Sequence, residues 1–256
     1  MTNKEIWRAA LEQSAADLNC QAEDFLRSEN LVTALRLGPS AKAYYKGTEP
    51  LALLMVSFGN NIVASAQDDC RDIVTEYVRS NDFFRCFVPP ALLWLDARLA
   101  RKGQRVSSLS EYYLPDVDAL RPLPCEYELK ILYPADFSGL YTPEWGNALC
   151  ADRRELDVLA VGAFDKNRLV GLAGCSADCA HMWQIGVDVL PDYRRKGIAA
   201  ALVSRLALEA LERGKIPFYG AKWSNLPSKR TALKSGFYPA WVELSASAQN
   251  VESEDL

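Results

Sequence analysis

The chain has 256 residues, of which 49% are apolar and 24% are charged, a balance typical of a globular protein long enough for two domains. The net charge of −4 argues against binding to nucleic acid, and no apolar run approaches the ~20 residues that a membrane-spanning helix needs. The polar first residues argue against a signal peptide, and the seven scattered cysteines indicate reduced thiols, so we expect a cytoplasmic protein.

The first half of the chain mixes helical and strand patterns. Apolar residues spaced along one face predict helices at residues 4–18, 21–28, 68–78 and 89–100. Apolar runs of strand length predict strands at residues 51–58, 62–66 and 107–114, the first two joined as a hairpin. No catalytic constellation stands out in this half. We therefore predict an N-terminal α+β domain at residues 1–120 without an assigned role.

Prolines punctuate residues 115–124, which we interpret as a linker to the second half. Strands are predicted there at residues 127–133, 156–164, 168–176, 182–189, 217–223 and 237–244. Helices are predicted at residues 135–140, 143–149, 195–213 and 226–235. The acidic tail at residues 249–256 is expected to be flexible.

The stretch from Val187 to Leu202 predicts a strand, a tight basic turn and the start of a long helix. Pro191 lacks a backbone donor and ends the strand. Three consecutive cations then precede Gly197: Arg194, Arg195 and Lys196. The free amides and the positive dipole end of a helix favour an anion, and glycine allows its close approach. The residues alone predict a phosphate or pyrophosphate site, with a basic helix entrance of no function as the alternative.

The sequence Arg194-Arg195-Lys196-Gly197-Ile198-Ala199 resembles the [Gln/Arg]-x-x-Gly-x-[Gly/Ala] signature of the GNAT acetyltransferase superfamily. Asn225 and Ser228, followed by Gly236 and Phe237, resemble its second cofactor motif. The resemblance covers about residues 126–245. It implies an α/β (α+β) fold whose GNAT-like catalytic domain, residues 121–248, has a mixed sheet flanked by helices. That the smaller N-terminal domain is a degenerate GNAT-like half remains open.

The resemblance also implies a co-substrate, acetyl-CoA, and the residues that contact it. In this family the turn amides hold the pyrophosphate, and a backbone amide of the preceding strand stabilises the oxyanion. The implied cofactor-binding residues are Val187, Val189, Arg194, Arg195, Lys196, Gly197, Ile198, Ala199, Asn225 and Ser228. Asn225 is equally compatible with capping the helix that follows it.

The catalytic acid and base depart from the family pattern. The tyrosine expected seven residues after Asn225 is replaced by Ala232, and Trp183 stands near the usual glutamate base. Asp188, on the strand face opposite the valines, is a candidate base, with a structural carboxylate as an equal alternative. His181, the only histidine, is the other candidate, with a plain loop residue as its alternative.

We therefore expect an acyl-CoA-dependent N-acyltransferase that transfers the acyl group directly to a small-molecule or protein amine in a ternary complex. Nucleic acid and membrane partners are not expected, and a homodimer is left open. The alternative is a non-catalytic CoA-binding or sensor module. Cys175, Cys179 and His181 only superficially resemble a metal clip, and Cys175 has no visible base that would make it a nucleophile.

Overall fold

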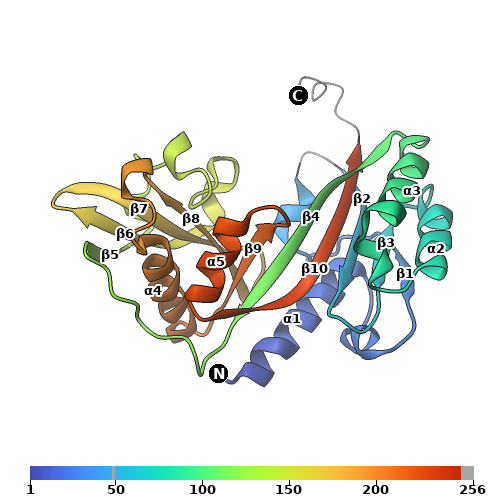
Figure 1. Ribbon diagram of the computed structural model, residues 1–256, viewed down its shortest axis with the longest axis horizontal. Coiled ribbons are helices and arrows are strands. Elements are labelled where there is room, and N and C mark those ends of the chain that lie inside the picture. The colour runs from blue at the N-terminus through green and yellow to red at the C-terminus, as the bar shows by residue number, and fades with distance from the viewer. Residues whose placement is uncertain (48–49, 249–256) are drawn as a thin grey trace. The chain divides into compact units, whose positions relative to one another are not determined.

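The structure, a computed structural model, describes residues 1–47 and 50–248 (Figure 1). Its α-helices are α1 (Asn3–Leu18), α2 (Arg71–Ser80), α3 (Pro89–Ala100), α4 (Ile198–Glu212) and α5 (Leu226–Lys234). Its strands are β1 (Leu31–Ala34), β2 (Leu51–Ser57), β3 (Val63–Ala66), β4 (Gln104–Pro115), β5 (Glu128–Leu132), β6 (Asp157–Asp165), β7 (Arg168–Ser176), β8 (Met182–Val189), β9 (Ile216–Lys222) and β10 (Phe237–Ala248). Short 3-10 turns lie between several of these elements.

The chain divides into two compact units, and neither is one continuous stretch of sequence. The first unit consists of Met1–Ala9 and Tyr112–Pro239. The second consists of Ala10–Glu111 and the chain from Ala240 onward. This division differs from the expected boundary at residue 120, because β10 returns to the second unit and pairs there with β2.

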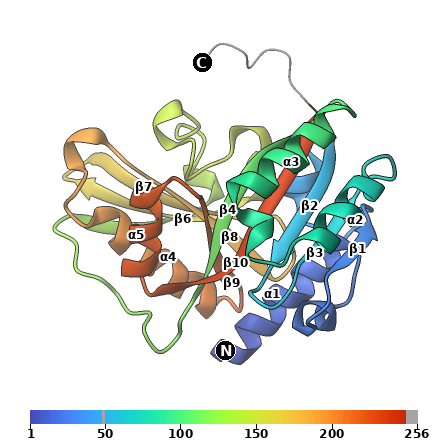
Figure 2. The ribbon, with the colours of Figure 1, turned by 45° about the vertical axis from the view of Figure 1, so that its right-hand side comes forward.

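In the first unit, five strands lie in the order β9-β8-β7-β6-β5, and the end of β4 from Tyr112 onward lies next to β9. Strands β5 to β8 pair antiparallel in sequence order, whereas β8 and β9 are parallel and are joined through α4. A parallel pair requires such a crossover connection. Helices α4 and α5 pack on the same face of these strands (Figure 2). A Cβ on Gly171 would lie 3.0 Å from Ile198 and Leu202, so this glycine lets α4 lie close to β7.

The segment between β5 and β6 covers the other face of this sheet. Six buried residues form the core there: Phe137, Trp145, Ala148, Leu149, Ala160 and Leu172. Gly174 and Gly186 are register partners on β7 and β8. A Cβ on them would lie 2.0 Å from the Ala148 carbonyl oxygen and 1.7 Å from that of Asn147, respectively. Only glycine at both positions lets the backbone of this loop rest on the strands.

In the second unit, five strands lie in the order β1-β3-β2-β10-β4. Strands β2 and β3 form the predicted hairpin, and β1 is parallel to β3. Helices α2 and α3 cover one face, where Val74 and Leu95 pack with Leu53 and Met55 of β2. The chain passes from β1 to its parallel neighbour β3 through β2, and the described part of the connection contains no α-helix like α4, so this topology lends no support to a degenerate copy of the first unit.

Most elements lie where the sequence predicts them, with ends shifted by a few residues. The helices expected at residues 135–140 and 143–149 are wrong, because each region holds a single 3-10 turn, Pro134–Asp136 or Pro143–Trp145. Gly139 and Gly146 follow these turns and weaken any longer helix. The region at residues 21–28 is also a 3-10 turn, and the tail at 249–256 lies outside the described residues. Within the described ranges, no helix has the length and apolar character needed to cross a membrane.

Candidate active site

The turn between β8 and α4 contains two residues with a left-handed backbone. A 3-10 turn, Pro191–Tyr193, follows β8, and α4 begins four residues after Arg194. The φ angle is 64° at Arg195 and 84° at Gly197, the residue that caps α4. Left-handed φ is uncommon for a residue with a side chain, and tight turns of this kind align successive backbone amides toward an anion.

The amide groups at the entrance of α4 are free to bind a ligand. Ala201 is the first residue whose backbone N–H makes a helical hydrogen bond, which it donates to the Gly197 carbonyl oxygen at 3.1 Å. Among the described residues, we find no acceptor for any backbone N–H from Arg195 to Ala200. Unpaired amides at a helix N-terminus, together with its positive dipole end, form a binding site for phosphate groups.

Two of the three predicted cations are engaged with the protein. Arg194 donates its Nε hydrogen to the Val189 carbonyl oxygen at 3.0 Å, and the Lys196 amine donates to the Tyr127 hydroxyl at 3.2 Å. Arg195 is exposed, and its guanidinium has no partner within the described chain. A further cation comes from α5, because the Lys234 amine lies 3.7 Å from where a Cβ on Gly197 would be.

Aromatic residues hold this turn in place. The Tyr193 hydroxyl donates to Asp165 at 2.9 Å, which ties the turn to the β6–β7 hairpin and raises the pKa of Tyr193. The Tyr127 and Tyr193 rings meet edge to face with centroids 5.5 Å apart, and the Lys196 amine lies 5.1 Å from the Tyr193 ring centre. The hydrogen bond with Tyr127 raises the pKa of Lys196, so this amine is charged at neutral pH.

The pairing of β8 with β9 ends beside this turn. The parallel register runs from Met182↔Ile216 to Ile185↔Tyr219 and goes no further within the described residues. The Leu190 N–H donates to the Val170 carbonyl oxygen of β7. Because backbone N–H and C=O groups alternate in direction along a strand, those of even-numbered residues on β8 point to β7, and those of odd-numbered residues point to the edge where β9 pairs. The backbone N–H of Val187 therefore faces the edge of β8 where the pairing with β9 has ended.

Asp188 lies on the opposite face of β8 from Val187 and Val189, as expected from the sequence. Its carboxylate accepts hydrogen bonds from the Asn147 backbone N–H at 2.8 Å, the Asn147 side-chain amide at 2.6 Å and the Ala148 N–H at 3.0 Å. These contacts fix the loop that rests on Gly186. The arrangement favours the structural interpretation of Asp188, and its role as a base stays a prediction.

His181 lies at the start of β8, and its carbonyl oxygen accepts a hydrogen bond from Ile216 at 2.9 Å. The side chain is exposed. Six residue-to-residue steps along an extended strand, about 20 Å, separate it from Val187. This position favours the loop-residue interpretation, because a general base must come within hydrogen-bonding reach of the reacting amine.

Helix α5 carries the second predicted motif. The Asn225 side chain accepts a hydrogen bond from the Ser228 N–H at 3.1 Å and therefore caps the helix. The Ser228 hydroxyl lies 2.8 Å from the Tyr219 hydroxyl of β9. Ala232 is fully buried one turn after Ser228, on the same side of α5.

Tyr219 is the candidate that sequence reasoning missed. It forms the last pair of the β8–β9 register, and it is 3% exposed. Burial raises the pKa of Tyr219, which keeps the phenol protonated at neutral pH. Its hydroxyl thus lies against the α5 face that presents Ala232, where the family resemblance expects a tyrosine. The only sequence signal is an aromatic residue near the end of a predicted strand, which is too common to identify an acid.

Cys175 is fully buried, and burial raises its pKa well above the ordinary value, so its thiol is unsuited to act as a nucleophile. Among the described residues, no three His, Cys, Asp or Glu side chains come together in a way that would hold a metal ion. Cys179 and His181 lie near the start of β8 because they belong to the segment that connects β7 and β8.

Comparison with known proteins agrees with this geometry. Residues 126–237 match the acetyltransferase (GNAT) family. No curated protein matches the chain. A GCN5-related N-acetyltransferase from Kribbella flavida is 16% identical, with a TM-score of 0.54 over 84% of this chain and 96% of that one, which supports a common fold.

Two other solved structures are more distant in shape. A GCN5-related N-acetyltransferase-like protein from Streptococcus suis 89/1591 is 23% identical, with a TM-score of 0.47 over 60% of this chain and 67% of that one. A GCN5-related N-acetyltransferase from Sphaerobacter thermophilus is 13% identical, with a TM-score of 0.48 over 96% and 94% of the two chains. Residues 126–237 are therefore similar to the acetyltransferase (GNAT) family.

Proposed function

We propose that the protein is an N-acyltransferase that uses acetyl-CoA and transfers the acyl group directly to an amine. The observation that carries this proposal is the row of unpaired backbone amides from Arg195 to Ala200, placed beside the end of the β8–β9 register. A diphosphate matches both the donors and the positive dipole end of α4. The exposed Arg195 and the nearby Lys234 add charge of the required sign.

Several features of the β8–α4 turn suit acetyl-CoA. Gly197 offers a backbone without a side chain, and a Cβ there would lie 3.7 Å from the Lys234 amine. The amides of residues 195–200 would hold the diphosphate, and the free backbone edge at Val187 would hold the pantetheine arm. When bound, acetyl-CoA supplies an acyl thioester, whose C–S bond breaks as the acceptor nitrogen bonds to the acyl carbon.

Three groups of the chain have distinct roles in this proposal. The Val187 N–H stabilises the negative charge that develops on the acyl oxygen. The Tyr219 hydroxyl supplies the proton that the leaving thiolate needs, in place of a tyrosine at Ala232. Asp188 acts as a positioning residue, because it holds the Asn147 loop against β8. The acceptor amine, from a small molecule or a protein, loses its proton to solvent or to another group of the acceptor molecule.

A non-catalytic CoA-binding or sensor module is the second candidate, and the buried Ala232 is the observation that favours it. The two functions differ in turnover. We expect the wild-type protein to release free CoA thiol from acetyl-CoA when a panel of primary amines is supplied. Binding of acetyl-CoA without thiol release across a broad panel of amines and amine-bearing peptides would favour the module. A cytoplasmic location and a homodimer remain predictions.

A further inference from the structure

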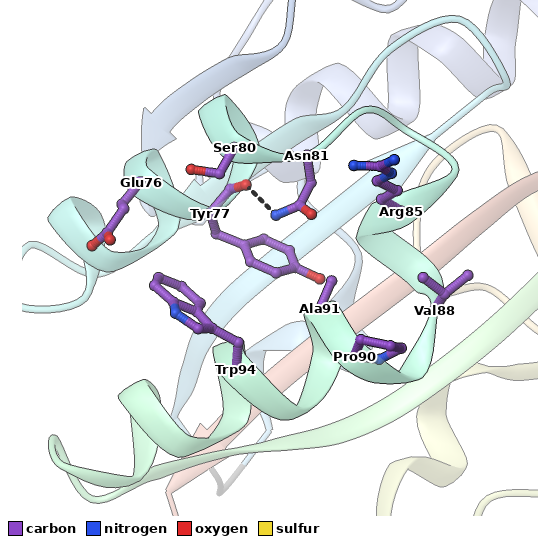
Figure 3. Close-up of a pocket in the computed structure, with 9 residues that line it drawn as sticks. All are labelled: Glu76, Tyr77, Ser80, Asn81, Arg85, Val88, Pro90, Ala91 and Trp94. Carbon is purple, nitrogen blue, oxygen red and sulfur yellow. Dashed lines mark hydrogen bonds between the residues drawn. The ribbon is translucent and has the colours of Figure 1, made fainter.

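A second candidate site lies within the second unit, in the groove between α2 and α3. The cavity has a volume of about 480 Å³, which falls in the range of small-molecule sites. Figure 3 shows the nine side chains that line it, with the Tyr77 ring at the centre, Trp94 and Glu76 toward one end, and Arg85 and Val88 toward the other.

The aromatic floor of this groove is held rigidly. The Tyr77 ring is 1% exposed, and its hydroxyl donates to the Cys86 carbonyl oxygen at 2.9 Å. Trp94 stacks with Tyr77 at a centroid distance of 6.0 Å, and the Arg98 guanidinium lies 4.6 Å from the Trp94 ring centre. A site whose walls are fixed before binding loses little conformational freedom when a ligand enters.

The charges of the lining indicate which ligand the groove prefers. Glu76 faces Arg98 at 3.6 Å, so its charge is balanced by a residue outside the lining. The side-chain amide of Asn81 already has a partner, because it donates a hydrogen bond to the Tyr77 carbonyl oxygen at 2.9 Å. The exposed Arg85 guanidinium has no partner among the residues that the structure describes. The free charge of the lining is therefore a single cation.

The neighbouring surface is unusually apolar. Phe84, directly before Arg85, is 72% exposed, and Val88 at the lip of the groove is 39% exposed. Pro90 and Ala91 continue the apolar wall along α3. A ligand for this groove needs an apolar body for the wall and one anionic end for Arg85, whose planar fork pairs best with a carboxylate.

From these contacts we propose that the α2–α3 groove binds a small monocarboxylate with an aromatic or branched apolar body. The carboxylate pairs with Arg85, and the apolar body lies against Trp94 and the apolar wall formed by Val88, Pro90 and Ala91. The proposal is independent of the transferase function, since none of the residues invoked belongs to the first unit.

The test is calorimetric titration of the full-length protein with 3-phenylpropanoate, compared with the isosteric neutral 3-phenylpropanamide and the cationic 3-phenylpropylamine. For a ligand of this size we expect a Kd of about 1 mM. The amide should bind the wild type about tenfold more weakly than the carboxylate does. The carboxylate should likewise bind Arg85→Gln about tenfold more weakly than it binds the wild type. Arg79→Gln, which changes an exposed arginine of α2 outside the lining, is the matched control and should bind as the wild type does.

The opposite results would overturn the proposal. Absence of saturable binding up to about 10 mM, well above the expected Kd, would show that the groove is not a site for this class. Equal affinity for the carboxylate and the amide, or preference for the amine, would show that Arg85 does not select the ligand. Binding that Arg85→Gln leaves unchanged would place the carboxylate elsewhere. Thermal melting of each variant without ligand establishes that it is folded.

Discussion

The Gly186→Ala substitution probes the loop that rests on β8. The new Cβ would lie 1.7 Å from the Asn147 carbonyl oxygen, and real contacts of this kind stay above 3.0 Å. The peptide must therefore retreat by at least about 1.3 Å (3.0 minus 1.7). A retreat of this size stretches the bonds from the Asn147 and Ala148 N–H groups to Asp188, now 2.8 and 3.0 Å, beyond hydrogen-bonding distance.

A hydrogen bond to a charged group contributes about 1.5–3 kcal/mol, and partial exposure of Asp188 reduces this. We expect Gly186→Ala to lower the free energy of unfolding by about 2–4 kcal/mol, which corresponds to a fall in Tm of about 5–15 °C. The assay is thermal and urea unfolding followed by circular dichroism. Gly139→Ala is the control, because a Cβ there meets nothing within 4 Å, and its Tm should stay within about 2 °C of the wild type. A Gly186→Ala protein as stable as this control would refute the close packing of the loop.

Three further predictions concern single side chains. Tyr219→Phe should lower the kcat of thiol release by about 100-fold or more, measured by steady-state kinetics, and should leave the affinity for acetyl-CoA, measured by calorimetry, unchanged. An unaltered kcat would show that Tyr219 is not the acid. Burial raises the pKa of Asp157 to about 6, above its unfolded value of about 4. The wild type should therefore lose about 2–3 kcal/mol of stability between pH 4 and 6 relative to Asp157→Asn, and parallel pH profiles of urea unfolding would contradict this. Asn225→Ala should cost about 1 kcal/mol of stability through loss of the α5 cap, and no change in urea midpoint would show that the cap is unimportant.

The sequence predicts much of the β8–α4 region because its signals are local. Pro191, the cation run and Gly197 stand next to one another, and each restricts the backbone or the charge at its own position. The apolar stripe from Ile198 onward likewise reports the buried face of α4 directly. These features suffice to place an anion site before any tertiary contact is known.

The parts of the site that depend on distant contacts could not be predicted in the same way. Asp188 meets Asn147 across 41 residues of sequence, and nothing local distinguishes a carboxylate that holds a loop from one that accepts a proton. The place of Tyr219 beside Ser228 depends on the register of β8 with β9. The interleaving of the two units in sequence depends on the return of β10 to β2, a pairing between strands far apart in the chain.

The central claim, that the amides before α4 bind the diphosphate of CoA, is tested most directly by calorimetric titration of acetyl-CoA into the wild type, Gly197→Asp and Gly214→Asp. The two glycines have similar left-handed φ angles, 84° and 70°, at opposite ends of α4, so backbone strain is matched and only the position of the carboxylate differs. A charge about 5 Å from the diphosphate costs about 3 kcal/mol, or about 100-fold in affinity. We predict saturable binding to the wild type and Gly214→Asp and about 100-fold weaker binding to Gly197→Asp; absence of binding to the wild type, or equal affinity in all three, would contradict the account.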